Sequence, residues 1–546
     1  MGLHFKTDHN IPKETLNVAR AVFPNGNIYM QLRDTLGNLY SDENFSDLFS
    51  FRGRPAESPG VLALVSVLQI AEGLSDRQAA DSVRARIDWK YLLNLELKDK
   101  GFDFTILHDF RERLITGGEE SKLLDILLRI FEERGLLKAR GSQRTDSTHI
   151  LAAVRNLNRL EVVGETLRFA LNRLSIDAPE WLKSIATPDW HERYEARFEM
   201  YRLPKSEEKR KKLALAIGAD GYDLLNGACG KDSPDRVRNN GAVEVLRQVW
   251  IQHYTLDRGK VVWRTPKDMP PSETLIQSPY DIEARHSRKR KTEWTGYKVH
   301  MTETFGTDFH VITNVETTPA TTQDNSVTDR IHASLAAKDL QPNRHIVDTG
   351  YVDADLMVES PKEYGIELVG PVLSDTSWQA RARKGFDVSA FKMDWKNKKA
   401  ICPQGRTSYG WNESFDLYKN PVVHIRFGKE ECSMCPARSN CTRAKSGPRT
   451  LKIRTEEQHK ILQHARQHQK TDEFKEVYKK RGGVEGTLSQ CIRKCEMRSS
   501  RYAGMAKNHL QNLLTAVAVN LARFFNWSEG IPHARTRTSA FAALAG

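Results

Sequence analysis

The sequence predicts a mixed α/β protein, and three observations lead to this fold class. Strand-like segments at residues 142–150, 296–316 and 344–347 accompany a helical segment at residues 326–340. Helical periodicity dominates residues 44–137 and 472–525, where apolar residues recur at spacings of three and four. Residues 355–470 are mixed, with proline, glycine and short strand-like runs. The length of 546 residues suggests several domains.

The composition excludes several classes of protein. Hydrophobic residues make up 39% of the chain and charged residues 28%, which is ordinary for a globular protein and unlike a disordered or collagen-like one. No apolar run approaches the roughly 18 residues that a membrane helix needs. The first residues, MGLHFKTDHN, lack the apolar segment of a signal peptide. We therefore expect a cytoplasmic protein.

The charge balance favours a polyanionic partner. The chain carries 83 Lys and Arg against 70 Asp and Glu, a formal net charge of +13. The excess is concentrated in three blocks, at residues 284–300, 433–454 and 479–507. Such blocks suit nucleic acid, although each one alone also fits a solvated face.

The N-terminal region is expected to be helical after a short strand at residues 26–31. Ser75 is a good helix N-cap, with Gln78 three residues later as its capping-box partner. The tight turn at residues 72–75 suits a helix-turn-helix-like module. A small helical domain without DNA contact fits this pattern equally well.

The order of the central strands and helix is typical of one known sheet architecture. A strand containing Asp146, a hairpin at residues 296–316, a helix, and a strand that ends at Asp348 together begin a ribonuclease-H-like sheet. In that architecture, carboxylates on the first and fourth strands and one on a later helix converge at one sheet edge. Glu485 lies on the later helix.

Three converging carboxylates suit phosphodiester chemistry. Two divalent ions about 3.5–4 Å apart can activate an attacking oxygen and stabilise a leaving one. Mg²⁺ prefers oxygen ligands, and clustered carboxylates repel one another unless a cation neutralises them. A single aspartate at a strand end is more often a turn or capping residue, so the prediction depends on three arriving in a compatible order.

Sequence motifs around these acids resemble a known family. Tyr478-x2-Arg481-x3-Glu485 resembles the signature of bacterial insertion-sequence transposases of the DDE superfamily. The DSTHI segment around Asp146 and HIVDTGYVD around Asp348 resemble the two aspartate strands of that family, and residues 281–304 resemble its hairpin. Residues 44–114 look like its N-terminal helical domain. The resemblance covers roughly residues 40–350 and 395–525.

The resemblance implies a ribonuclease-H-like core with an inserted mixed/β domain and an N-terminal all-helical domain. Asp146, Asp348 and Glu485 would be catalytic ligands of Mg²⁺ or Mn²⁺, and Tyr478 and Arg481 would contact DNA. The family's usual lysine, seven residues after the glutamate, is replaced by Ile492, so Arg493 is the alternative there. The basic stretch on the hairpin adds Arg288, Lys289, Trp294 and Lys298 as DNA-binding candidates. Trp294 could stack on an unpaired base or anchor a strand edge.

The expected activity is that of a DNA transposase. It would bind the inverted-repeat ends of an insertion sequence, cleave the strand and join the freed 3′-hydroxyl to target DNA, as a homodimer on DNA in the bacterial nucleoid. A metal-dependent nuclease without strand transfer, and a DNA-binding regulator derived from a transposase, are the alternatives. The expected domain boundaries are 1–137 (helical, DNA-end binding), 138–354 (first part of the core, with a helical insertion at about 151–275), 355–470 (insertion), 471–527 (second part of the core) and 528–546 (flexible tail).

Four of the seven cysteines lie in the second insertion. Cys432-x2-Cys435-x5-Cys441 has the spacing of a metal knuckle, and Cys402 can complete a tetrahedral site. Because disulfides are disfavoured in the cytoplasm, structural Zn²⁺ is the preferred interpretation over unliganded thiols. Cys229, Cys491 and Cys495 are interpreted as packing residues.

Overall fold

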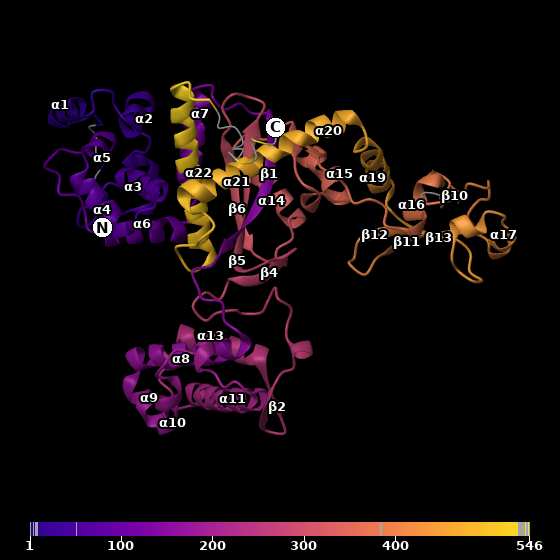
Figure 1. Cartoon of the computed structure of the whole chain (residues 1–546), viewed down its shortest axis with the longest axis horizontal. Helices are drawn as coiled ribbons and strands as arrows, with labels where there is room; N and C mark the ends of the chain where they lie inside the picture. The colour runs from indigo at the N-terminus through magenta and orange to yellow at the C-terminus, as the bar shows by residue number, and fades with distance from the viewer. Residues whose placement is uncertain are drawn as a thin grey trace.

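A mixed six-stranded sheet forms the centre of the molecule, with helical and mixed lobes around it (Figure 1). The computed structural model describes residues 2–3, 5, 9–50, 52–382, 385–532, 541 and 544. The strands are β1 (Ser142–Leu151), β4 (Arg285–Lys289), β5 (Thr292–Phe305), β6 (Ile312–Pro319), β7 (Arg344–Ile346) and β8 (Glu367–Val369). The order across the sheet is β6–β5–β1–β7–β8, and β4 pairs with the start of β5. The mixed α/β class and the strands predicted at residues 142–150, 296–316 and 344–347 are confirmed.

Strand direction changes in the middle of the sheet. β5 runs antiparallel to β1 and β6, whereas β1, β7 and β8 are parallel. Val299 and Met301 of β5 are fully buried on one face, and His300 and Thr302 are fully buried on the other. A strand that is covered on both faces must satisfy its polar side chains internally, and His300 hydrogen-bonds to Tyr351 at 2.6 Å.

Seven helices of the described N-terminal residues pack on one flank of the sheet. They are α1 (Lys13–Val22), α2 (Ile28–Leu36), α3 (Pro59–Glu72), α4 (Asp76–Ala85), α5 (Ile87–Leu92), α6 (Thr105–Thr116) and α7 (Lys122–Glu133). The predicted capping box of Ser75 and Gln78 is present at the start of α4. Helices α2 to α7 share one hydrophobic core with the sheet and with α22 (Met505–Ser528), and they pack mainly against α22. Helix α1 packs in a small separate cluster with Met30 and Tyr91.

The predicted strand at residues 26–31 is wrong, because this segment begins helix α2. The side chain of Asn27 accepts hydrogen bonds from the backbone N–H groups of Tyr29 and Met30, which starts the helix. Met30 and Leu36 are then buried at helical spacing. The helix cap, rather than the β-branched character of Ile28, decides the local structure.

The segment between β1 and β4 forms a separate helical lobe with its own hydrophobic core. It contains α8 (Arg159–Asp177), α9 (Pro179–Ile185), α10 (Pro188–Tyr194), α11 (Glu207–Cys229), α12 (Asp235–Arg238), α13 (Gly241–His253) and the hairpin of β2 (Tyr254–Asp257) and β3 (Lys260–Trp263). The fully buried Trp250 lies directly on Gly221, where a Cβ would be 2.0 Å from the indole ring. This position therefore requires glycine for close packing.

The remaining helices follow the sheet strands. They are α14 (Asn325–Ala337), α15 (Ala354–Glu363), α16 (Trp378–Ala382), α17 (Lys429–Ser433), α18 (Arg438–Cys441), α19 (Glu456–His468), α20 (Asp472–Lys479), α21 (Gly483–Cys495) and α22. A small β lobe holds β9 (Lys392–Asp394), β10 (Lys399–Ile401), β11 (Gly410–Phe415), β12 (Pro421–Arg426) and β13 (Thr450–Arg454). The helices predicted at 326–340 and within 472–525 are confirmed.

Two further features concern the ends of these elements. The C-terminal helical region is interrupted at residues 496–504, where Glu496 adopts a left-handed backbone conformation (φ 51°). Most of the predicted tail, including residues 533–540, lies outside the described residues. Within the described part of the chain, none of the helices is long and apolar enough to span a membrane.

Candidate active site at the sheet edge

Asp146 and Asp348 lie side by side on parallel strands. β1 pairs with β7 so that Arg144 is opposite Ile346, and each aspartate lies two residues further along its own segment. Asp348 follows the end of β7 and caps a short 3₁₀ turn, Thr349–Tyr351, by accepting the N–H of Gly350 at 2.7 Å. The sheet register therefore brings two carboxylates together, one within β1 and the other just beyond the end of β7.

Glu485 reaches the same edge from the first turn of α21. One guanidinium joins the two sides: Arg481 donates to Asp146 Oδ2 and to Glu485 Oε1, each at 2.8 Å. Asp146 is mostly buried, with 13% of its side chain exposed, whereas Glu485 is 61% exposed. One guanidinium thus links Asp146 to Glu485, and Glu485 lies on the open side.

The surroundings of Asp146 disfavour its charged form. Burial raises the pKa of Asp146 above its ordinary value, and the neighbouring charge of Asp348 raises it further, although the Ser147 N–H and Arg481 act in the opposite direction. A cation that binds here would stabilise the charged carboxylates. The oxygen-only set of side chains suits Mg²⁺ or Mn²⁺.

Sequence reasoning missed a fourth carboxylate beside this pair. Asp324 precedes α14, yet its side chain makes no cap hydrogen bond there. A Cβ on Gly350 would be 3.0 Å from Asp348 Oδ1 and 3.2 Å from Asp324 Oδ2, so the two carboxylates flank this glycine. The segment TTQDNS resembles an ordinary helix start, and nothing in it distinguishes Asp324 from a capping residue.

Tyr478 packs against the arginine that bridges the carboxylates. Its ring stacks on Phe474 at 5.6 Å, and the Arg481 guanidinium lies 5.8 Å from the centre of the Tyr478 ring. Burial raises the pKa of the Tyr478 phenol, and the charge of Asp348 adds to this effect. The tyrosine therefore helps to hold Arg481 over the site.

The structure places the basic candidates in two kinds of environment. Arg288, Lys289 and Arg493 are exposed, the first two on the β4–β5 hairpin. Lys298 is only 15% exposed and pairs with Asp324 at 3.0 Å. Trp294 differs from the expectation of an accessible ring: it is 3% exposed, packs against His149 and donates from Nε1 to the Tyr297 carbonyl.

The four cysteines of the second insertion lie together. Cys402, Cys432, Cys435 and Cys441 line one cavity of about 30 Å³, and burial together with the neighbouring thiols raises the pKa of Cys441. Cys491 and Cys495 are buried in the core, as expected for packing residues. Cys229 is exposed, so its interpretation as a packing residue is wrong.

No preformed metal cluster is present among the residues that the structure describes. In that part of the chain, no group of three or more His, Cys, Asp or Glu side chains is arranged to hold a metal ion. At the sheet edge, the Arg481 guanidinium lies between Asp146 and Glu485.

Comparison with known protein families gives two matches. Residues 401–525 match the transposase DDE domain, a range that includes Tyr478, Arg481 and Glu485. Residues 17–113, which form the N-terminal helices, match a second transposase domain, DUF772. No curated protein and no solved structure matches the chain. Both matched domains are transposase domains, and together they support an insertion-sequence transposase of the DDE superfamily.

Proposed function

We propose that the protein binds the inverted-repeat ends of an insertion sequence and catalyses metal-dependent strand cleavage and strand transfer, with Asp146, Asp348 and Glu485 as the catalytic carboxylates. The observation that carries the proposal is the contact of one guanidinium, Arg481, with both Asp146 and Glu485, beside Asp348. The sheet order β6–β5–β1–β7–β8, with β5 antiparallel to its neighbours, supports a ribonuclease-H-like core.

The three carboxylates would hold Mg²⁺ or Mn²⁺. When bound, these ions activate the attacking oxygen and stabilise the leaving oxygen of an in-line displacement. Asp146 and Asp348 provide rigid ligands because the strand register fixes them, and Glu485 adds a longer side chain from the open side. Arg481 and Tyr478 would orient a DNA phosphate, since a guanidinium can bond two phosphate oxygens at once.

The domain roles follow from packing. The helices of residues 1–137 would bind the element ends while remaining docked on the core. Residues 138–354 and 471–527 would form the catalytic core, and the separate hydrophobic clusters in residues 151–275 and 355–470 support two insertions. Joining requires two element ends, so we propose a homodimer on DNA.

The deciding experiment is a strand-transfer assay with labelled end DNA, target DNA and Mg²⁺. We expect cleavage at the element end followed by a joined product. Hydrolysis without joined product would instead support a nuclease, and binding without cleavage would support a regulator derived from a transposase.

The exposed β4–β5 hairpin is expected to contribute to DNA affinity. Replacing Arg288 and Lys289 together by alanine should weaken binding and reduce the slope of log K against log salt by about 1.8, the value for two phosphate contacts. Fluorescence anisotropy across a salt series measures both quantities. The matched control is the double replacement of exposed Lys209 and Lys211 on α11, which should leave the slope unchanged. If the wild-type protein and both double variants had equal slopes, the hairpin would not be part of the DNA interface.

Zinc at the four-cysteine cavity is a separate proposal. The four thiols line one cavity, and the backbone N–H of Arg406 donates to Cys402 Sγ at 3.3 Å, which suits a thiolate ligand. We expect about one zinc per chain by metal analysis and a marked loss in Cys435→Ser. Cys229→Ser, on the distant α11, is the control and should retain the metal. Less than about half an equivalent in the wild-type protein would contradict this proposal.

A further inference from the structure

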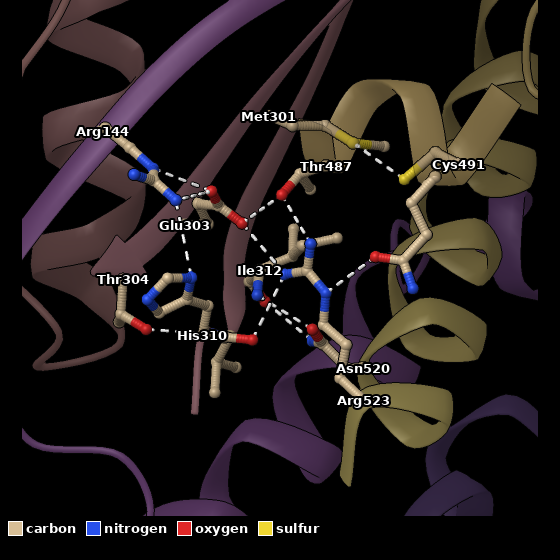
Figure 2. Close-up of polar contacts among 12 residues, drawn as sticks. Arg144, Met301, Glu303, Thr304, His310, Ile312, Thr487, Cys491, Asn520 and Arg523 are labelled. Carbon is tan, nitrogen blue, oxygen red and sulfur yellow. Dashed lines mark hydrogen bonds and ion pairs between the residues drawn. The ribbon is translucent and has the colours of Figure 1, made fainter. Parts of the chain in front are cut away.

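A buried charged cluster lies behind the helix that carries Glu485 (Figure 2). Its centre is Glu303 of β5, whose side chain has no exposed surface. Arg144 of β1 and Arg523 of α22 approach it from two sides, and Thr487 of α21 approaches it from a third. Four elements that are distant in sequence therefore meet at one carboxylate.

Both oxygens of Glu303 are fully used. Oε1 accepts from Arg144, at 2.8 Å from Nε and 2.7 Å from Nη2. Oε2 accepts from Arg523 at 2.9 Å and from the Thr487 hydroxyl at 2.5 Å. The same hydroxyl accepts a hydrogen bond from Arg523, so threonine joins the two charged groups.

The cluster keeps Glu303 ionised in the interior. Burial alone would raise the pKa of Glu303, but Arg523 and Arg144 together with the Thr487 hydrogen bond hold it below its ordinary value. Packed apolar residues often stabilise a core as well as a buried ion pair does, so stability is a weak explanation for three buried charges. Their directional hydrogen bonds, in contrast, can fix the position of a helix.

The cluster holds α21 and the residues just before it at three points. Arg144 donates to the carbonyl of Lys480, the residue before Arg481. Thr487, two residues after Glu485, is held by Glu303 and Arg523, and Arg523 also donates to Gln490 Oε1 at 3.0 Å. All three anchor points lie within five residues of Glu485.

A glycine makes this close approach possible. A Cβ on Gly483 would lie 2.2 Å from Arg144 Nη1, so the guanidinium rests on the glycine backbone. The φ of Gly483 is −64°, which any residue can adopt. Position 483 therefore requires glycine because a larger side chain would clash with Arg144, and not because of its backbone conformation. The absence of a side chain allows the start of α21 to lie close to β1.

We infer that Glu303, Arg144, Arg523 and Thr487 form a positioning cluster that sets the place of Glu485 relative to Asp146. Arg144 is two residues before Asp146 on β1, so one side chain ties both parts of the site to the same carboxylate. This inference rests on the proposed catalytic role of the three carboxylates. A displacement of about 1 Å at a catalytic group can cost about 100-fold in rate.

The most informative test removes only the hydroxyl that connects the cluster to α21. In Thr487→Val the Glu303 ion pairs with Arg144 and Arg523 remain, so the protein should still fold. We expect kcat for cleavage to fall about 10- to 100-fold with KM and DNA affinity nearly unchanged. Thr487→Ser keeps the hydroxyl and should restore kcat to near the wild-type value.

The matched control is Thr515→Val on α22. Thr515 is also fully buried, but its hydroxyl bonds to the Gln511 carbonyl of its own helix. If Thr487→Val and Thr515→Val lowered kcat equally, in proportion to a loss in Tm, the cluster would be merely structural and the inference would be overturned. Wild-type kcat in Thr487→Val would overturn it as well.

Amide hydrogen exchange separates this inference from the proposed function. In Thr487→Val we expect faster exchange confined to residues 483–495, with no such change in Thr515→Val. This readout needs no catalytic activity, so it holds even if the wild-type protein fails to cleave DNA. Unchanged exchange in α21 would overturn the positioning role whatever the activity assay shows.

Discussion

Glu485→Gln is expected to abolish DNA cleavage while leaving DNA binding intact. Glutamine keeps the size of the side chain and can still accept from Arg481, but it removes the charge that would hold a divalent ion. We expect the single-turnover cleavage rate of labelled end DNA to fall by about 1,000-fold or more, a loss typical of removing one member of a catalytic unit. Affinity measured by fluorescence anisotropy should change less than about twofold, because Glu485 is anionic and makes no favourable phosphate contact.

A matched control is available on the preceding helix. Glu476 of α20 is exposed, so Glu476→Gln makes the same chemical change close to the site without altering the carboxylate set. Its cleavage rate should remain near that of the wild-type protein. If Glu485→Gln cleaved DNA within about tenfold of the wild-type rate, Glu485 would not be the third ligand. The proposed mechanism would then need another carboxylate, and Asp324, which flanks Gly350 together with Asp348, is a candidate.

The sequence was sufficient to predict that Asp146 and Asp348 lie side by side, because order along the chain constrains sheet topology. A strand, a hairpin, a helix and a parallel strand leave few ways to pair, and the pairing that results places Asp146 beside Asp348. The Tyr478–Arg481–Glu485 spacing then required only that one helical segment approach this edge. The N-cap at Ser75 was also predictable, because it depends only on neighbouring residues such as Gln78.

What the sequence did not reveal depends on contacts between distant segments. Asp324 looks like a helix cap, and only the folded chain brings it to Asp348 and Lys298. Glu303 lies inside a predicted strand, where a charged residue is expected to face solvent, and its arginine partners are 159 and 220 residues away. Trp294 is buried against His149, which comes from the distant strand β1.

A large effect of pH on stability is expected from buried histidines. His300, His332 and His345 have no exposed surface, and His253 is 2% exposed. Burial lowers the pKa of His300 and His253 to about 3 and that of His332 to about 4, and it lowers the pKa of His345 well below its ordinary value. His345 is held between Thr145 and His332 by hydrogen bonds of 2.7 and 2.8 Å, beneath the strand that carries Asp146.

These histidines are neutral in the folded protein, whereas in the unfolded chain they become protonated below pH 6.5. The unfolded state therefore binds more protons than the folded state at low pH, which lowers the free energy of unfolding. Stability is therefore fully present above pH 6.5 and falls as the pH drops toward the folded pKa values. At pH 5 the loss is about 2 kcal/mol for His300 alone, and several such groups approach the whole stability of a domain.

Urea unfolding between pH 7.5 and 5 measures this dependence as the free energy of unfolding. In His332→Gln, the amide can replace Nε2 as the partner of His345 without titrating, so the slope below pH 6.5 should decrease by about one proton. His464→Gln, on the exposed side of α19, should leave the slope unchanged. A constant free energy from pH 7.5 to 5 in the wild-type protein would show that the histidines protonate without cost. The sheet face that carries His300 and His345 would then be accessible to water, contrary to the burial of both side chains.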